Sequence, residues 1–428
     1  MVKEILTSLR GFKDIHDITE IKYFEEFEKI ISNITNQYGI CELRTPIVEK
    51  TELFKRSIGA DTDIVNKEMY TFEDRNGESV SLRPEGTASC VRCALEGNLI
   101  FDRGIKRQKF WYLGPMFRRE RPQQGRFRQF HQFGLEYFGF NNTNSDLEII
   151  MLGNRLFDKE LKLNDVKLHI NSIGDGIDRK KYGEKIKSLL KKLKNKLDKD
   201  QMETLSRNPI RLLDNKDKTL KKILKELPNL VDSISNKSKK RFDDLLEKLN
   251  KSNIDYVLDN SIVRGLDYYN DTVFEWKHAS LGSQDAICAG GRYDSLVNNV
   301  GGVHVPAIGF AAGIERIIFL LTKFNKITTQ NKTVAAINYS KKSDYLCLRK
   351  LEKLRDQFKK IIFYTTDSSS TLDKQFKQAE KLNPRYILYF GDDEISSNKY
   401  TIKDFKSGEK QEKLTEDELS KKLSSINE

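Results

Sequence analysis

The sequence predicts an α+β protein with a strand hairpin near the middle of the chain, a helical insertion after it, and a smaller α/β domain at the carboxyl end. An aromatic run at 110–117 is followed by an alternating run at 128–138, which is typical of two strands joined by a loop. Lysine and leucine dominate residues 174–253, which indicates helices. After residue 333, apolar runs alternate with amphipathic segments, which favours a small domain with a mostly parallel sheet.

The composition is that of a globular protein with two or three domains, since 38% of the 428 residues are hydrophobic and 32% are charged. There is no run of about 18 apolar residues and no signal-like amino terminus, so we expect a cytoplasmic protein without a membrane partner. The net charge of +12 favours a polyanionic partner. A general richness in lysine, isoleucine and asparagine can also produce part of this charge.

The five cysteines fit a reducing compartment. Cys90 and Cys93 have CxxC spacing, but a zinc site needs a second pair that the sequence lacks. We therefore expect a reduced, partly buried pair and no structural metal.

The amino-terminal part predicts a helix and then an edge strand. Apolar residues recur at helical spacing from Glu20 to Tyr38, and Gly39 is placed to end the helix. In the next segment, YGICELRTPIVEKTELF, Pro46 follows a short strand. Proline cannot donate to a central ladder, so we expect this strand at an edge or a crossover.

Glu85 and Thr87 lie at the start of a further predicted helix. A strand ends at Leu82, Pro84 suits the first turn of a helix, and Gly97 suits the position just past its end. The carboxylate of Glu85 either holds an ammonium group or complements the helix dipole, and the residues alone leave both interpretations open.

The second strand of the hairpin carries polar groups on one face. Gln132, Gly134 and Glu136 point to that face, and aromatic and apolar residues alternate with them. Because Gly134 has no side chain, a flat ligand can lie against the backbone there. The loop before this strand is rich in guanidinium groups, which match phosphate oxygens, although a solvated hairpin tip is the alternative. Its charged residues are Arg118, Arg119, Glu120, Arg121, Arg126 and Arg128.

The residues after the hairpin predict a helix at about 142–165, with Leu147, Ile150, Met151 and Leu156 on one side. The lysine-rich insertion at 174–253 comes next. Its charge either contacts nucleic acid or forms a solvated face, as charge runs usually do.

Two later segments carry further candidate site residues. In RGLDYY, Arg264 can neutralise developing phosphate charge, and Tyr268 and Tyr269 can stack on and hydrogen-bond a heteroaromatic ring. Ordinary aromatic core is the alternative for the two tyrosines. In VPAIGFAAGIERIIFLL, small residues allow close backbone packing under a ligand, and Arg316 lies on the helix that follows. The sequence has no P-loop and no convincing GxGxxG after a strand.

Together these segments resemble the class II aminoacyl-tRNA synthetases, and the histidyl-tRNA synthetase family in particular. The strand with Pro46 is similar to motif 1, FRRERPQQGRFRQFHQ to motif 2, and VPAIGFAAGIERIIFLL to motif 3. LRPEGT, RGLDYY and CAGGRYD resemble segments characteristic of the family, although Ser295 replaces a usual glycine. The motifs occur in the family's order along nearly the whole chain.

The resemblance implies a domain plan. A class II catalytic domain built on an antiparallel sheet would span residues 1–325, with the helical insertion at about 174–253 near the tRNA acceptor stem. A linker at 326–333 would lead to an anticodon-binding α/β domain at 334–428. Motif 1 forms the dimer interface in the family, so the resemblance also implies a homodimer.

The resemblance implies the activity of a histidine–tRNA ligase. The histidine carboxylate would attack the α-phosphate of ATP, with Mg²⁺ accompanying the triphosphate, and tRNA(His) would then accept the histidyl group. Arg118 and Arg264 would be catalytic. By the same resemblance, ATP would be bound by Arg118, Glu120, Arg126 and Arg316, and L-histidine by Glu85, Thr87, Arg118, Gln132, Glu136, Arg264, Tyr268 and Tyr269.

Two alternatives share the fold but not the reaction. A non-catalytic paralogue serves as the regulatory subunit of ATP phosphoribosyltransferase, and a nucleic-acid-binding regulator could use the fold as a sensor. The intact RGLDYY string, the arginine-bearing motif 2 and the carboxy-terminal α/β domain count against the paralogue, and the presence of Arg118 and Arg316 counts against the regulator.

Overall fold

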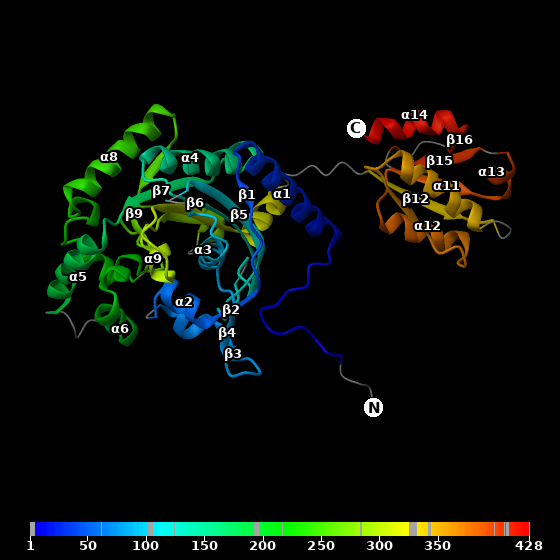
Figure 1. Cartoon of the computed structure of the whole chain (residues 1–428). Helices are drawn as coiled ribbons and strands as arrows, with labels where there is room; N and C mark the ends of the chain where they lie inside the picture. Colours follow the sequence, from blue (N-terminus) through cyan, green and yellow to red (C-terminus); the bar gives the residue numbers. More distant parts are fainter. Residues whose placement is uncertain are drawn as a thin grey trace. The chain divides into compact units, whose positions relative to one another are not determined.

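The computed structural model describes residues 5–427, except 61, 102, 103, 105, 124, 192–196, 216, 283, 284, 325–331, 341–343, 398, 406 and 408–410. The chain forms two compact units, Met1–Ile327 and Thr328–Glu428 (Figure 1). Most of the predicted linker at 326–333 lies outside the described residues, and Thr333 already belongs to a strand. In the described part of the chain, no helix has the length and apolar character that crossing a membrane requires.

Eight of the described strands of the first unit form one large sheet. Its inner pairs are antiparallel, and the pair at each edge is parallel. The predicted α+β class and the hairpin are confirmed, and the strand with Pro46 after it lies at the sheet edge as expected. In spatial order the strands are β1 (Cys41–Glu42), β5 (Gln108–Phe117), β6 (Gln129–Phe138), β11 (Ala307–Gly313), β10 (Ala286–Arg292), β9 (Asn270–Lys277), β7 (Lys167–Ser172) and β8 (Tyr256–Leu258).

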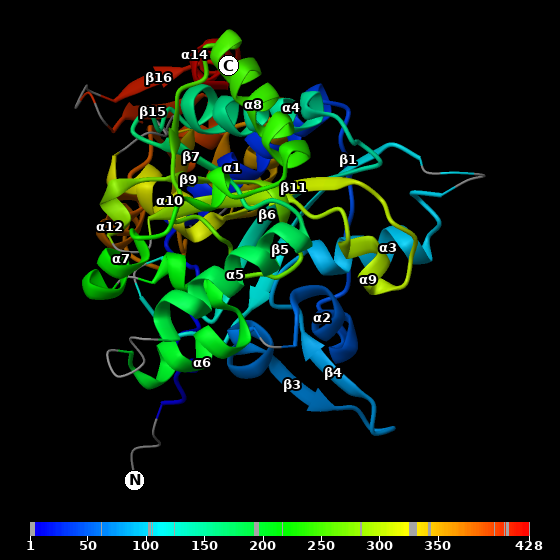
Figure 2. The same cartoon turned by 90° about the vertical axis from the view of Figure 1, so that its left-hand side faces the viewer.

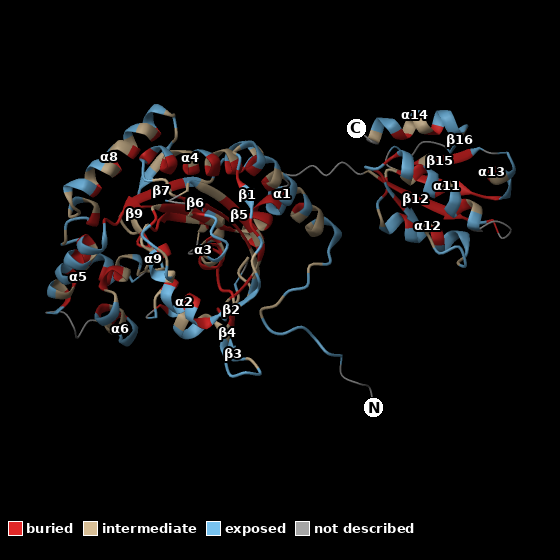
Figure 3. Ribbon diagram, in the orientation of Figure 1, coloured by how far each residue is buried: buried red, intermediate tan, exposed pale blue. Residues whose placement is uncertain are grey.

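One face of this sheet is covered by helices that share a large apolar core with it (Figures 1 and 3). Phe133 and Leu135 of β6 point into this core, as their alternation predicts. Side-chain oxygens cap three of the helices. Asp17 accepts from the Glu20 N–H at 2.9 Å, Asn142 from the Ser145 N–H at 3.0 Å, and Ser235 from the Ser238 N–H at 3.4 Å. The helices are α1 (Ile18–Gln37), α4 (Thr143–Asn154), α8 (Asn236–Lys251) and α10 (Ile314–Lys323).

The opposite face of the sheet meets shorter elements and the helical insertion (Figure 2). The insertion and the segments 90–94 and 296–297 share a second apolar core with this face, whereas residues 53–64 form a smaller core with Ala88. The predicted helical character of the insertion is confirmed. The short elements are α2 (Thr51–Ile58), η1 (Ile64–Glu68), α3 (Thr87–Glu96), α9 (Leu296–Val300) and a small sheet of β2 (Val48–Lys50), β4 (Ser79–Leu82) and β3 (Tyr70–Glu73). The insertion includes α5 (Gly176–Lys191), α6 (Lys199–Arg207), η4 (Pro209–Asp214), α7 (Lys218–Leu224) and η5 (Leu230–Asp232), and it ends with α8, which covers the other face of the sheet.

Two helix predictions need correction. The helix expected at Pro84 begins at Thr87, because the Glu85 carboxylate caps it from outside. The helix expected at 142–165 ends at Asn154 and continues as a π-helical turn, η2 (Arg155–Glu160). Met151 is 42% exposed rather than buried, because the core-facing stripe runs through Ile149 and Leu152.

The second unit is an α/β domain, as predicted, with the described strands in the order β13-β12-β14-β15-β16. Only β13, β12 and β14 are parallel; β15 and β16 add an antiparallel edge that the sequence did not predict, because these strands are short and largely polar. The strands are β12 (Thr333–Asn338), β13 (Ile362–Thr365), β14 (Tyr386–Phe390), β15 (Tyr400–Asp404) and β16 (Glu412–Leu414), and the helices are α11 (Asp344–Gln357), α12 (Leu372–Lys381), α13 (Asp392–Ser396) and α14 (Glu416–Asn427).

Candidate active site

Cross-strand register brings the candidate residues together on the sheet face opposite the large core. Glu136 of β6 pairs with Gly309 of β11, which pairs with Gly291 of β10. Paired residues of neighbouring strands point to the same side of a sheet. In the next row, Ala311 pairs with Ala289, so small residues line the middle strands. Small residues therefore leave space above the centre of the sheet, and side chains from the neighbouring elements point toward it.

Glu136 lies at the centre of a group of buried side chains, the Glu136 chamber, which also includes Thr87, Tyr268, Tyr269 and Tyr293. Its carboxylate is 1% exposed and accepts hydrogen bonds from the Thr87 hydroxyl at 2.7 Å and from the Tyr293 hydroxyl. A Cβ at Gly309 would lie 2.0 Å from the Glu136 carboxylate, so this position has room only for glycine. Burial raises the pKa of Glu136 to about 8, because the charged form loses its hydration.

Three buried tyrosines, Tyr268, Tyr269 and Tyr293, pack against one another beside Glu136. The ring centres of Tyr268 and Tyr269 are 4.6 Å apart, and those of Tyr268 and Tyr293 are 5.7 Å apart. Burial raises the pKa of all three phenols, so their hydroxyls stay protonated and can donate. Tyr293, rather than Tyr269, is the direct partner of Glu136. The chamber can thus offer a carboxylate and phenols to a polar ring.

The start of α3 closes one side of the chamber. The Glu85 carboxylate accepts from the Thr87 and Ala88 N–H groups, each at 2.8 Å, so the helix-capping interpretation holds in this structure. Burial also raises its pKa. Gln132 accepts from the Gly86 N–H at 3.0 Å and links β6 to this corner. The structure therefore brings Glu85, Thr87, Gln132 and Glu136 together.

The space over Gly134 is not open, which corrects the prediction that a ligand lies there. A Cβ at Gly134 would be 2.2 Å from the ring of Tyr112, its partner on β5. The same ring would meet a Cβ at Gly86 at 2.1 Å. Tyr112 fills the gap left by both glycines, so it packs β6 against the start of α3.

A cavity of about 230 Å³, which Gln132 also lines, adjoins this group of side chains and is strongly basic. Burial lowers the pKa of Arg118, Arg126 and Arg316, and the other guanidinium groups nearby lower it further, to about 10 for Arg126. Groups that repel one another in this way gain from a bound polyanion. The charged residues that line the cavity are Arg118, Glu120, Arg126, Arg264, Glu315 and Arg316.

Backbone and carboxylate contacts hold these arginines in place. Arg118 donates to the Pro84 carbonyl at 2.8 Å and lies 3.6 Å from the carboxylate of Glu120. Arg126 pairs with Glu120, and Arg316 donates to the Ala286 carbonyl at 2.5 Å. The predicted phosphate-binding residues thus converge, although they come from distant parts of the chain.

Sequence reasoning missed Tyr112, Tyr293 and Glu275. Tyr293 belongs to the CAGGRYD string, so its segment was singled out, but its direction toward Glu136 across 157 positions was not. Tyr112 lies in an aromatic run in which no position stands out. Glu275 of β9 pairs with Arg264, and only the register of β9 against β10 reveals it.

The described part of the chain has no cluster of three side chains suited to hold a metal ion. All five cysteines lie in that part, where none of them forms a disulfide, and Cys90 is buried on α3.

Comparisons with known proteins cover almost the entire chain. A family model described as "Histidyl-tRNA synthetase" matches residues 11–317, and one described as "Anticodon binding domain" matches residues 333–426. The histidine–tRNA ligase of Marinomonas sp. (strain MWYL1) is 43% identical over 410 residues, which cover 95% of this chain and 96% of that protein. That of Buchnera aphidicola subsp. Schizaphis graminum (strain Sg) is 44% identical over 406 residues, 94% of each. Among solved structures, apo S. aureus histidyl-tRNA synthetase matches with a TM-score of 0.78 and 29% identity, over 99% of this chain and 100% of that one.

Proposed function

Because this chain belongs to the histidyl-tRNA synthetase family, we propose that the Glu136 chamber binds histidine and that the adjoining basic cavity binds ATP. The chain is an aminoacyl-tRNA ligase that joins histidine to tRNA. One observation carries the residue assignment: a buried carboxylate with hydroxyl partners lies next to a cavity lined by four arginines.

Histidine recognition rests on groups that only a polar ring can satisfy. Glu136 accepts one imidazole N–H, and Tyr269 or Tyr293 pairs with the other ring nitrogen. Glu85, Thr87 and Gln132 hold the amino and carboxylate groups. An apolar side chain would leave these buried groups unpaired, and sites of this kind reject such analogues by roughly 10⁴ or more.

Adenylation needs positioning and charge stabilisation rather than covalent help from the protein. The histidine carboxylate attacks the α-phosphate of ATP, and pyrophosphate leaves. Arg118 and Arg264 hold the α-phosphate region while negative charge develops, and Arg126 and Arg316 hold the rest of the triphosphate. In the second step the terminal ribose hydroxyl of tRNA attacks the histidyl carbonyl, and AMP leaves.

The donor groups of the basic cavity fit a Mg²⁺ ion that arrives with ATP. Mg²⁺ usually takes one or two carboxylates together with phosphate oxygens and water. Glu120 is buried at 8% exposure, lines the cavity and supplies such a carboxylate. When bound, the ion would neutralise charge on the phosphates.

Three further features remain proposals. Residues 1–325, with the insertion at 174–253, act as the catalytic domain, and residues 334–428 bind the anticodon region of tRNA(His). The protein works as a homodimer, which is supported by exposed apolar side chains next to motif 1, with Ile47 at 41% and Val48 at 44% exposure. A cytoplasmic location is supported by the five cysteines, which form no disulfide in the structure.

Histidine-dependent exchange of ATP with labelled pyrophosphate, followed by charging of tRNA(His), tests the assignment. We expect both activities in the intact chain. Replacing Glu136 should abolish the exchange that depends on histidine. Histidine binding without exchange would instead identify the regulatory paralogue of ATP phosphoribosyltransferase. Sedimentation of the intact chain tests the dimer.

A further inference from the structure

Arg264 has a strained backbone that its neighbours must hold. Its φ of 48° lies in the left-handed region, which a bulky side chain rarely adopts. Such a conformation persists only where surrounding contacts fix it, and it is frequent where function depends on placement. Arg264 belongs to the loop between β8 and β9, and its guanidinium lines the basic cavity.

The sheet fixes the guanidinium end of Arg264. Glu275 of β9 pairs with Arg264 through one carboxylate oxygen, and Lys277 lies 3.4 Å from the other. Lys277 in turn contacts Asp259 at 3.0 Å, at the start of the same loop. These contacts orient the side chain but do not touch the peptide groups that follow Arg264.

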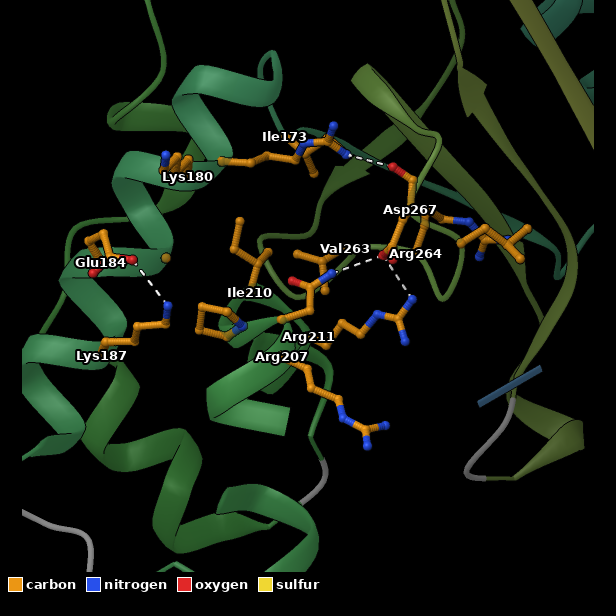
Figure 4. Close-up of a pocket in the computed structure, with 15 residues that line it drawn as sticks. Ile173, Lys180, Glu184, Lys187, Arg207, Ile210, Arg211, Val263, Arg264 and Asp267 are labelled. Carbon is orange, nitrogen blue, oxygen red and sulfur yellow. Dashed lines mark hydrogen bonds and ion pairs between the residues drawn. The ribbon is translucent and has the colours of Figure 1, made fainter. Parts of the chain in front are cut away.

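The helical insertion fixes those peptide groups. Arg211 of η4 donates to the Gly265 carbonyl at 3.0 Å and to the Asp267 carboxylate at 2.9 Å, and Asn208 donates to the same carboxylate oxygen at 2.9 Å. Arg179 of α5 donates to the Asp267 carbonyl at 3.3 Å and to the Tyr269 carbonyl. Figure 4 shows Arg211 directed at Asp267 from the insertion.

The insertion is packed closely enough to hold the Arg264 loop in place. A Cβ at Gly183 of α5 would lie 2.9 Å from Pro209, so α5 and η4 are in close contact. Ile186 and Ile210 share a core with Tyr268 and Tyr269. A displacement of α5 or η4 therefore moves the loop that carries Arg264.

We propose that Arg211 is a positioning residue for adenylation, through which the helical insertion holds the Arg264 loop in its reactive conformation. The inference rests on the proposed role of Arg264. Arg211 shares a cavity of about 500 Å³ with Arg118 and Arg264, and it acts through its hydrogen bonds to Gly265 and Asp267. Any movement that a bound partner imposes on the insertion would change the rate of adenylation by the same route.

The experiment compares Arg211→Met with Arg207→Met in the full chain, by pyrophosphate exchange over ranges of histidine and ATP. Arg207 lines the same cavity of about 350 Å³, but it pairs with Glu203 at 2.9 Å on the surface and points away from Asp267 (Figure 4). We expect Arg211→Met to lower kcat about tenfold to a hundredfold, as displaced catalytic groups do, with both KM values within about threefold. Arg207→Met should leave kcat within about twofold of the parent chain, and Arg211→Lys should restore part of the loss.

A second variant keeps the test decisive if Arg211→Met folds poorly. Asp267→Asn removes the partner charge, should lower kcat in the same way, and should add little to Arg211→Met in the double variant, because coupled residues are not additive. Equal kcat values for Arg211→Met and Arg207→Met, or an unchanged kcat for Asp267→Asn, would overturn the inference. An inactive parent chain would instead count against the proposed function.

Discussion

Replacing Glu136 with glutamine should change the pH dependence of stability in a defined direction. In the folded chain burial raises the pKa of Glu136 to about 8, whereas the ordinary value is 4.5. Between these two pH values the folded state binds a proton that the unfolded state has released. The stabilising effect of the protonated carboxyl is therefore complete below about pH 4.5 and is lost as the pH rises toward 8. Glutamine keeps the shape of the side chain and cannot ionise.

The size of the effect follows from the shift. Between the two pKa values, each pH unit lowers the free energy of unfolding by about 1.4 kcal/mol for one proton. From pH 5 to pH 7 the parent chain should therefore lose about 3 kcal/mol of stability relative to Glu136→Gln. The variant and the parent should have similar free energies of unfolding near pH 5, and the variant should be the more stable of the two at pH 7. The variant should also lose histidine-dependent exchange, because the carboxyl group can ionise when it accepts an imidazole N–H, whereas the amide cannot.

Urea unfolding followed by tryptophan fluorescence measures this difference. Both tryptophans, Trp111 and Trp276, lie in the core of the first unit, so the signal reports the unit that contains Glu136. The protein concentration must stay fixed, because association shifts apparent stability. Glu26→Gln, on the exposed side of α1, is the matched control and should follow the parent at every pH. Parallel curves for the parent and Glu136→Gln would refute a neutral, buried carboxyl.

Three further predictions concern packing, a buried ion pair and the metal. Gly134→Ala should destabilise the first unit by about 1–3 kcal/mol, because the new methyl group meets the ring of Tyr112; an unchanged urea midpoint would contradict this. Arg292→Met should cost about 3–5 kcal/mol, because the fully buried Asp146 carboxylate loses its nearer charge partner, 2.6 Å away, and keeps only the contact with Arg241 at 3.8 Å. Pairing it with Asp146→Leu should recover most of that loss in the same assay, and no recovery would mean that packing rather than charge explains the effect. Removing Mg²⁺ with EDTA should stop pyrophosphate exchange and leave the unfolding midpoint unchanged, whereas a fall in the midpoint would reveal a structural metal.

Patterns within single elements were enough to predict much of the fold. The alternation on β6 separated Glu136 from Phe133, because successive strand residues point to opposite faces. The alternation along β6 could not predict which side chain lies above Gly134, because Tyr112 comes from the neighbouring strand. The exposure of Met151 escaped prediction for a similar reason, because several faces of a mostly apolar helix are compatible with the sequence.

The sequence by itself determined the order of the motifs, the family they belong to and the residue types available for chemistry. The tertiary structure decided which of these residues meet. Tyr293 contacts Glu136 across 157 positions, and Arg211 contacts Asp267 across 56. Periodicity assigns a residue to a face of its own element, whereas contacts between distant elements depend on strand register and core packing. For that reason the candidate residues could be named from the sequence, but the partners that hold them could not.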